Sequence, residues 1–387
     1  MAMTTQSRDV TERLKNPTVI PITRKGSRIP ELDGWRAISV LLVIAAHFVV
    51  LHHPVVLEKH PILAPAFRSF GPLGVSVFFI ISGFVICRLL MLEEEQTGSV
   101  SLKGFYYRRA FRILPPFMLY LFVLLILEFL HFIYERRFAL LWSGLFLCDS
   151  NLAPRTPFIA HTWSLAVEEQ FYLIFPTAWL LIPSKWRIRA CFFAFLICAL
   201  WGLWRIHAGP MTILVSGAPA SFSCICFGVL LALCEKRARR VVSRIPSLVV
   251  LFLVLVAVIP PASAGSWQLI LFGSLIYPPI VGLTLLFSVE NRGWLSRFLC
   301  SPPLQKIGVM SYGAYLWQEL FTASDASYAA KGFWIRNGLP LLLIVVPLSY
   351  TFIEKPAMRL GKRLSERAKA ISLQHARELL TPAQPGV

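Results

Sequence analysis

The sequence predicts an all-α protein that crosses a membrane many times, and three features of the chain indicate that fold class. Of its 387 residues, 56% are hydrophobic and only 15% are charged, and the mean hydropathy is +0.64. This composition lies outside the usual range of soluble domains. The apolar residues gather in long runs, and positive charges gather between alternate runs. We therefore expect a polytopic helix bundle of about ten transmembrane helices.

Ten apolar segments are long enough, as helices, to approach the roughly 30 Å of a bilayer's hydrocarbon core. They lie at about 36–53, 71–92, 113–133, 161–182, 190–207, 213–234, 247–261, 267–288, 305–322 and 338–354. The segment 247–261 is the shortest of them. A further apolar stretch at 138–148 is too short to cross, so we expect it to lie at the interface or to re-enter the membrane.

The loop charges predict the orientation of the bundle, because arginine and lysine are retained on the cytoplasmic side during insertion. With ten spans, one side receives the basic clusters within 24–28, 103–112, 185–189 and 236–244, and later the C-terminal tail. Both termini are therefore predicted to be cytoplasmic, and topology explains most of the net charge of +18. Because the basic residues are spread over loops, we expect no nucleic-acid partner.

The chain divides into one predicted membrane domain and two short tails. Residues 1–30 are polar and lack the apolar core and cleavage signature of a signal peptide, so we expect an N-terminal cytoplasmic tail. Residues 31–356 form the transmembrane domain. Residues 357–387 form a basic cytoplasmic tail that is too short for a second domain.

Eight cysteines are scattered through apolar stretches without paired spacing. Cys224 and Cys226 are two residues apart, but no further pair of Cys or His stands near them to complete the four ligands of a zinc site. We expect the cysteines to be small core residues, and we expect no metal site.

Arg36 and His47 both lie in the first apolar segment, where ionisable side chains are costly. Eleven residues separate them, which is almost three helical turns, so they share one face about 16 Å apart. His47 then lies close to the bilayer midplane. A neighbouring hydroxyl could satisfy such a histidine, but an arginine on the same face favours two ends of one functional cavity.

The fourth apolar segment begins with the motif His-Thr-Trp-Ser-Leu-Ala-Val-Glu-Glu-Gln-Phe-Tyr at 161–172. It carries Glu168 and Glu169 into the membrane, roughly 100° apart around the helix, so at most one of them faces the same cavity as His47. Glu168 shares a face with His161. A carboxylate beside an imidazole is a general-base arrangement, and the alternative is a structural ion pair with an arginine.

Arg109 and Arg112 share a helix face at the cytosolic mouth of the third segment. Together with Arg36 they could hold the phosphates of a cytosolic coenzyme through charge-assisted hydrogen bonds, although positive-inside retention also explains such a cluster. The stretch 71–84 brings small residues, including Ser82 and Gly83, which permit close helix packing or leave room for a ligand.

These motifs resemble the bacterial acyltransferase 3 family, whose membrane proteins acylate hydroxyl groups of surface sugars and of some secreted metabolites. Four regions match in order along nearly the whole chain: Leu32-Asp-Gly-Trp-Arg36 followed by His47, then 74–84, 109–115 and 161–172. The weaker stretches 311–317 and 352–356 also look like family landmarks. The chain is similar to stand-alone members without a fused esterase-like domain. It departs from the family at Gln318, where relatives often carry His, and in the sixth segment, which lacks an arginine often found there.

The resemblance implies a ten-helix fold that transfers an acyl group from cytosolic acyl-CoA, expected to be acetyl-CoA, to a carbohydrate hydroxyl. Acyl-CoA is then a co-substrate, and no cofactor is permanently bound. His47 would act as general base or would transiently carry the acyl group. We assign catalysis to Arg36, His47, Glu168 and Glu169, donor binding to Arg36, Arg109 and Arg112, and acceptor binding to Ser82, His161, Trp163 and Ser164.

The leading hypothesis is therefore an O-acyltransferase of the bacterial cytoplasmic (inner) membrane that modifies O-antigen, exopolysaccharide or another glycan or glycolipid. A secreted metabolite or a macrolide sugar is the alternative acceptor. The rival from another class is a transporter or flippase that uses Arg36, His47 and Glu168 as a relay, which the absence of a visible internal repeat disfavours. A structural assembly factor for envelope polysaccharide is a third possibility, and it predicts that substitutions of Arg36 and His47 are tolerated.

Overall fold

The computed structural model describes residues 28–52, 54–60, 64–149, 156–207, 213–258, 272–323, 327–332, 335 and 337–380. Nearly all of these residues are helical. No strand occurs in these ranges, although one antiparallel bridge joins Ile133 to Tyr328. The all-α prediction is confirmed. The predicted N-terminal tail up to residue 27, residues 381–387 of the C-terminal tail and parts of the segments 247–261 and 267–288 lie outside the described residues.

The helices follow the predicted apolar segments. The first half of the chain contains α2 (Pro30–His47), the π-helix η1 (Phe48–His52), α3 (Pro54–Lys59), α4 (Ala64–Thr97), α5 (Leu102–Phe129), α6 (Arg137–Gly144), the short η2 (Pro157–Ile159) and α7 (Thr162–Leu181). The second half contains α8 (Ser184–His207), α9 (Ile213–Leu233), α10 (Glu235–Val242), α11 (Ser247–Val258), η3 (Phe272–Ile276), α13 (Tyr277–Glu290), α14 (Trp294–Leu299), α15 (Pro302–Val309), α16 (Ser311–Trp317), α17 (Glu319–Thr322), η5 (Ala330–Gly332), η6 (Leu339–Leu341), α19 (Leu342–Ser349), η7 (Tyr350–Glu354) and α20 (Lys355–Leu380).

Several helices extend beyond the predicted apolar segments, and α5 and α20 extend furthest because polar residues continue the helix. α5 begins at Leu102, where the apolar run predicted a start near 113, because Ser101 caps the helix by accepting a hydrogen bond from the Gly104 N–H at 3.2 Å. α20 continues as helix through most of the predicted C-terminal tail. The segment 305–322 is divided into α15, α16 and α17.

Four helical stretches are long and apolar enough to cross a membrane. They are Pro30–Val50, Ala66–Thr97, Leu102–Phe129 and Leu339–Ala370. Two shorter apolar helices cover Ser221–Leu233 and Ser274–Glu290. Length and composition do not decide whether the remaining segments cross, so the ten spans and the cytoplasmic termini stay predictions.

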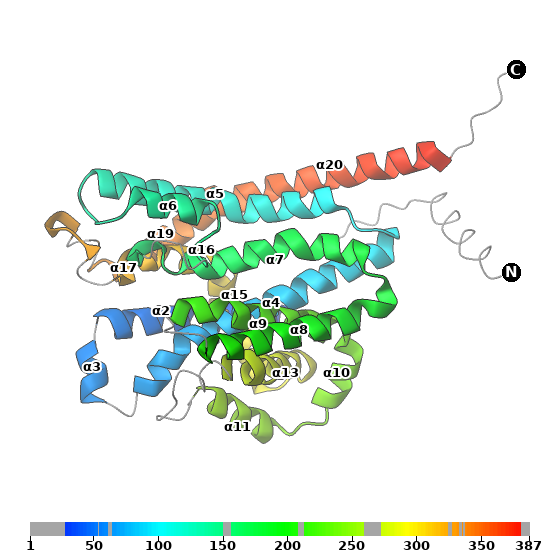
Figure 1. The fold of residues 1–387 in the computed structure, drawn as a ribbon, viewed down its shortest axis with the longest axis horizontal. Coiled ribbons are helices and arrows are strands. Elements are labelled where there is room, and N and C mark those ends of the chain that lie inside the picture. The colour runs from blue at the N-terminus through cyan, green and yellow to red at the C-terminus, as the bar shows by residue number, and fades with distance from the viewer. Residues whose placement is uncertain are drawn as a thin grey trace, which may run out of the picture.

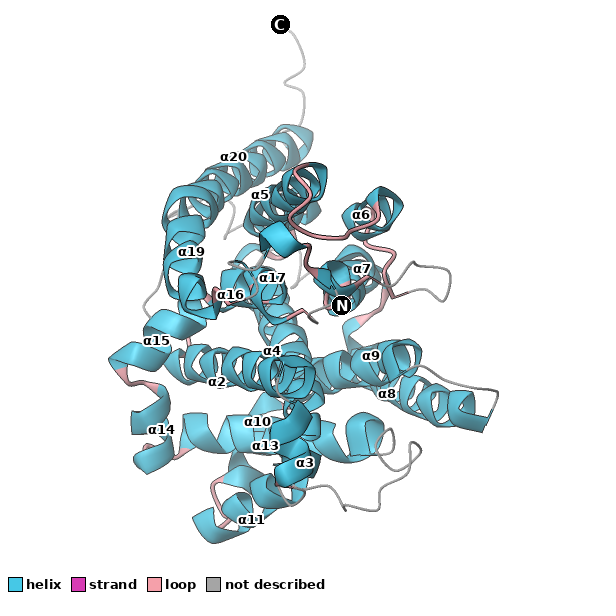
Figure 2. Ribbon diagram, turned by 90° about the vertical axis from the view of Figure 1, so that its left-hand side faces the viewer, coloured by secondary structure: helices cyan, strands magenta, loops and turns pink. Residues whose placement is uncertain are grey.

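α2 and α4 lie at the centre of the bundle and pack against each other. Most of the long helices run lengthwise in Figure 1, with α5 and α20 side by side along one edge. The end-on view in Figure 2 shows α8 and α9 on one side of α2 and α4, α13 beneath them, and α5, α7, α16 and α20 above. The centre of the bundle therefore receives side chains from segments that are far apart in the sequence.

Glycines bring α4 and α9 into close contact. A Cβ atom on Gly83 would meet the carbonyl oxygen of Ile225, and one on Gly228 would meet the carbonyl oxygen of Ile80. Small residues at such crossings let helix backbones approach closely in membranes. Of the two roles that the sequence allowed for the small residues of α4, Gly83 has the packing role.

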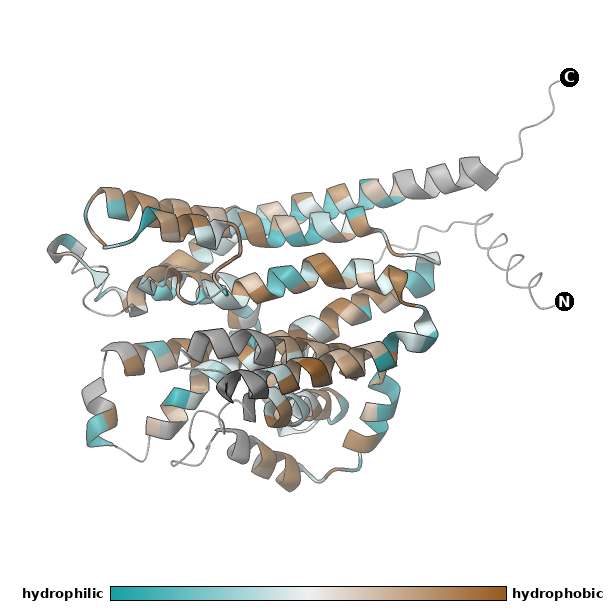
Figure 3. Cartoon of the chain, in the orientation of Figure 1, coloured by the Kyte–Doolittle hydropathy of each residue, from teal (hydrophilic) through white to brown (hydrophobic). Residues whose placement is uncertain are grey.

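Many large apolar side chains are exposed on the helices, and hydrophobic residues extend along most of the helices in Figure 3. Those that are at least 66% exposed include Phe129, Leu173, Leu181, Leu248, Leu343 and Phe352. A soluble protein rarely exposes so many large apolar groups, whereas in a bilayer they contact lipid. The surface is that of a membrane protein.

Candidate functional site

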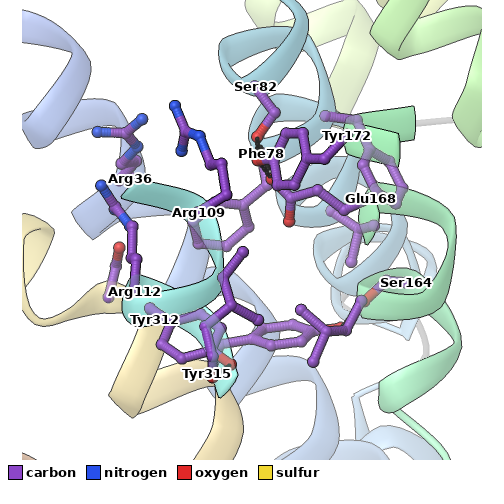
Figure 4. A pocket seen from close by; sticks show the side chains of 15 residues that line it. Arg36, Phe78, Ser82, Arg109, Arg112, Ser164, Glu168, Tyr172, Tyr312 and Tyr315 are labelled. Carbon is purple, nitrogen blue, oxygen red and sulfur yellow. Dashed lines mark hydrogen bonds between the residues drawn. The ribbon is translucent and has the colours of Figure 1, made fainter. Parts of the chain in front are cut away.

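A pocket between α2, α4, α5, α7 and α16 gathers six of the predicted site residues (Figure 4). The empty space within its outline, which includes open solvent, amounts to about 710 Å³. The predicted residues that line it are Arg36, Ser82, Arg109, Arg112, Ser164 and Glu168, and three tyrosines join them, Tyr172, Tyr312 and Tyr315. The four motif regions of the sequence therefore all contribute to one pocket.

Three guanidinium groups occupy one side of the pocket (Figure 4). Arg36 donates a hydrogen bond of 3.1 Å from Nη1 to Asp33, which lies one turn earlier on α2. In the described part of the chain, neither Arg109 nor Arg112 has a carboxylate partner. The Arg109 guanidinium instead lies 5.1 Å from the centre of the Tyr172 ring. The pocket therefore holds two guanidinium groups that form no close ion pair with the described residues, while the carboxylates of Glu168 and Glu354 act on Arg109 and Arg112, respectively, at longer range.

Neighbouring arginines at the same end of the bundle are neutralised. Arg108, the residue before Arg109 on α5, forms an ion pair with Glu93 at 3.1 Å. Arg187 makes a bidentate pair with Glu94, with N···O distances of 2.6 and 2.9 Å. Positive-inside retention accounts for these arginines but not for leaving two guanidinium groups unpaired in one pocket. The arrangement fits an anionic ligand.

Glu168 lies across the pocket from the arginines (Figure 4). The hydroxyl groups of Ser82 and Tyr172 both donate to its Oε1 atom. Its neighbour Glu169 does not line the pocket, and Oε1 of Glu169 is buried without a hydrogen-bond partner among the described residues. Of the two adjacent carboxylates, only Glu168 faces this pocket.

His47 ends α2 directly before the π-helix η1 and is not among the pocket's lining residues. Its Nδ1 atom lies 3.0 Å from Nε2 and 3.3 Å from Oε1 of Gln318, and 3.5 Å from Oε2 of Glu319. The carboxylate that the structure places beside the imidazole is therefore that of Glu319. The expected support from Glu168 or Glu169 is not what the structure shows, because α7 directs Glu168 to Ser82 and Tyr172.

Glu319 was missed by the sequence reasoning, although the sequence held a signal for it. It is a carboxylate within the apolar segment 305–322, and intramembrane carboxylates are usually functional. It also directly follows Gln318, which the family resemblance had singled out as a departure. Its pairing with His47 depends on tertiary packing across more than 270 residues, which helix periodicity does not reveal.

Tyr315 connects the pocket to the surroundings of His47. Its hydroxyl lies 2.6 Å from Oγ of Ser164 and donates to the His161 carbonyl oxygen at 3.1 Å. Gln318 follows Tyr315 by three residues, a rise of about 5 Å along a helix. The partners of His47 therefore lie about one turn beyond the pocket wall.

His161 and Trp163 lie outside the pocket lining. The His161 ring is 3% exposed and packs edge-on against the rings of Tyr120 and Tyr315, and neither ring nitrogen has a hydrogen-bond partner among the described residues. The indole of Trp163 packs against Phe79 in the core.

Comparison with known proteins identifies the family. Residues 29–353 match the acyltransferase domain of the acyltransferase 3 family. The chain belongs to this family. No solved structure matches the chain.

Relatives with related names come from three bacteria. A protein of Staphylococcus aureus (strain COL), provisionally named an O-acetyltransferase, is 30% identical over 87% of this chain and 58% of its own length. The peptidoglycan O-acetyltransferase OatA of Listeria monocytogenes is 27% identical over 86% of this chain and 56% of its own length. YrhL of Bacillus subtilis, provisionally named a peptidoglycan O-acetyltransferase, is 27% identical over 88% of this chain and 56% of its own length. The chain thus spans less than two thirds of the length of these relatives.

The acyltransferase 3 chain offers two kinds of chemistry in adjacent places. The arginine side of the pocket can bind an anion, and the imidazole of His47 can exchange a proton. In the described residues, no three His, Cys, Asp or Glu side chains lie close enough to hold a metal ion, and the eight cysteines are not paired in disulfides.

Proposed function

We propose that this protein is a membrane O-acetyltransferase that transfers an acetyl group from cytosolic acetyl-CoA to a hydroxyl of a cell-envelope carbohydrate. One observation carries the proposal: three arginine side chains, two of them without a carboxylate partner among the described residues, line a pocket about one helical turn from the partners of His47. Membership of the acyltransferase 3 family supports the same reaction.

The arginines are suited to the phosphates of coenzyme A. A guanidinium group binds phosphate through two parallel, charge-assisted hydrogen bonds, and coenzyme A carries a pyrophosphate and a 3′-phosphate. In the proposal, Arg36, Arg109 and Arg112 hold these groups. The elongated pantetheine arm then runs past Tyr315 toward His47, a distance of about 16 Å along α2 from Arg36.

His47 is proposed to act as the general base. Its Nδ1 atom faces Gln318 and Glu319, and Nε2 has no hydrogen-bond partner among the described residues. Nε2 takes the proton of the acceptor hydroxyl while the hydroxyl oxygen bonds to the thioester carbon. The carbon–sulfur bond breaks, and the departing thiolate takes the proton back from Nε2. The products are an O-acetyl ester and free coenzyme A.

The acceptor is proposed to be an envelope glycan, and peptidoglycan is the first to test. Two of the relatives carry peptidoglycan in their names, an acceptor that the sequence reasoning did not foresee. We also propose that the chain crosses the cytoplasmic membrane ten times. A cytosolic donor needs the arginine side of the pocket to face the cytoplasm.

The test is a transfer assay with protein purified in detergent. Acetyl-CoA is incubated with soluble peptidoglycan fragments, free thiol is followed with time, and the O-acetyl product is identified by mass spectrometry. The wild type is expected to release thiol only when the acceptor is present, and His47→Ala is expected to release none while remaining folded. If folded wild-type protein neither binds acetyl-CoA nor releases thiol, the proposed function fails, and a transporter that uses the buried ionisable residues as a relay becomes the better hypothesis.

A further inference from the structure

Glu319 is a buried carboxylate in an unfavourable position. The residue is 3% exposed, and its Oε2 atom has no hydrogen-bond partner among the described residues. Oε2 of Glu319 lies 3.5 Å from Nδ1 of His47. The two groups form an ion pair only when the imidazole is protonated. With a neutral imidazole, the charge on Oε2 is poorly compensated, which is costly away from water.

We propose that Glu319 is a positioning residue for the transfer reaction. Its Oε2 atom, which has no hydrogen-bond partner among the described residues, stabilises the state in which His47 has taken up a proton. This inference rests on the function proposed above. When Nε2 accepts the acceptor's proton, the imidazole becomes a cation next to the carboxylate. The attraction is therefore stronger in the transition state, where the imidazole carries a full charge, than before the reaction, and only such differential interactions raise kcat.

The pair also selects the tautomer of His47. A carboxylate near Nδ1 favours a proton on Nδ1, which leaves the lone pair on Nε2 free to act as the base. Gln318, which is completely buried, places both its amide nitrogen and its amide oxygen within reach of the same Nδ1 atom. The amide can therefore accept from a protonated Nδ1 or donate to a bare one. Glu319 is the group that distinguishes the two tautomers.

The decisive variant is Glu319→Gln, assayed with acetyl-CoA and peptidoglycan fragments. An amide of the same shape removes the charge and can donate to Nδ1, which moves the imidazole proton to Nε2. We expect kcat to fall about 10²–10⁴-fold, as expected when a catalytic imidazole has the wrong tautomer. The KM for acetyl-CoA should stay within about twofold of the wild type, because the arginines that bind the donor are unchanged.

Thermal stability supplies a readout that separates this role from a structural one. Replacing an unfavourable buried charge by a neutral group of equal size should leave the thermal midpoint of Glu319→Gln equal to or above that of the wild type. Glu319→Asp keeps the charge, so its kcat should be at least tenfold higher than that of Glu319→Gln. The combination of a slower enzyme with an unreduced midpoint is the expected signature.

Glu135 supplies the matched control. It is also buried, at 8% exposure, and its Oε2 atom also lacks a hydrogen-bond partner among the described residues, but it lies in the loop between α5 and α6 and forms no ion pair with His47. Glu135→Gln should leave kcat at the wild-type value. Wild-type kcat in Glu319→Gln, or a clear fall in its thermal midpoint, would overturn the inference. If His47→Ala also remains fully active, the proposed function itself has failed.

Discussion

Single charges without partners decide what the pocket can bind. Arg36, Arg109 and Arg112 repel one another, and the surrounding apolar helices screen that repulsion less than water does. An anion between them is attracted by all three groups. Arg36 is held by Asp33, whereas Arg109 is oriented by the face of Tyr172, whose hydroxyl is held in turn by Glu168. In the proposed donor site, Arg109 is therefore oriented by a neutral ring, which leaves its guanidinium charge available.

Removing one unpaired guanidinium should weaken donor binding without abolishing chemistry. We expect Arg109→Ala and Arg112→Ala each to raise the KM for acetyl-CoA at least tenfold, which corresponds to about 1.4 kcal/mol of lost interaction. The steady-state transfer assay measures this. Arg240→Ala removes the same charge from an exposed position on α10 and should leave the KM unchanged. Equal effects of all three variants would mean that only the overall charge matters.

The Glu135 carboxyl should make the free energy of unfolding depend on pH, and substituting this one residue isolates its contribution. Burial raises the pKa of its carboxyl above its ordinary value of 4.5, although the N–H of Arg136 donates to it at 2.8 Å. The folded protein thus holds this proton more tightly than the unfolded chain does. The free energy of unfolding should fall as the pH rises from about 4.5 through the raised pKa, and then level off.

The comparison is a set of thermal midpoints between pH 4 and pH 8 for the wild type and Glu135→Gln. The variant has no carboxyl to titrate at this position, so its midpoints should decline less over the interval. Parallel curves would contradict the assignment of this carboxyl as a buried titrating group.

At the scale of elements, close contacts between a few helices fix where the functional side chains lie. α4 is pressed against α9 at Gly83 and Gly228, and this leaves Ser82 facing α7. α2 changes from an α-helix to a π-helix immediately after His47. Wider π-turns occur frequently at functional sites, because they alter the direction of the side chains that follow.

The contact between α4 and α9 can be tested without touching the pocket. Gly228→Ala places a methyl group against the carbonyl oxygen of Ile80, so one helix must shift. We expect the free energy of unfolding to fall by about 1–3 kcal/mol, the usual cost of overpacking. Thermal midpoints in detergent measure the effect. Gly293→Ala is the control, because an added Cβ there meets no atom within 4 Å.

Across the whole molecule, the sequence revealed features that depend on one segment and missed those that depend on packing. Apolar length located the helical segments, and the helical repeat correctly put Arg109 and Arg112 on one face. The same repeat could not show which carboxylate meets His47, since Glu319 comes from a segment near the other end of the chain. Apolar length also could not foresee that the polar residues around Arg108 extend α5.

Orientation in the membrane is the property of the whole molecule that the proposed reaction requires. α3 and α10 lie toward opposite ends of the bundle (Figure 1), and α10 carries the basic cluster that positive-inside retention assigns to the cytoplasm. We expect Lys59→Cys, on α3, to be outside and Arg240→Cys, on α10, to be inside. Each is made in a variant whose eight native cysteines are replaced by serine or alanine.

A thiol reagent that does not cross membranes should label Lys59→Cys in intact cells and should label Arg240→Cys only after the cells are permeabilised. The arginine side of the pocket lies with the basic end of the bundle, so this result would give cytosolic acetyl-CoA access to Arg36, Arg109 and Arg112. The reverse labelling pattern would turn these arginines toward the outside, where no cytosolic donor could reach them, and the donor assignment would then fail even if the arginine variants weaken catalysis.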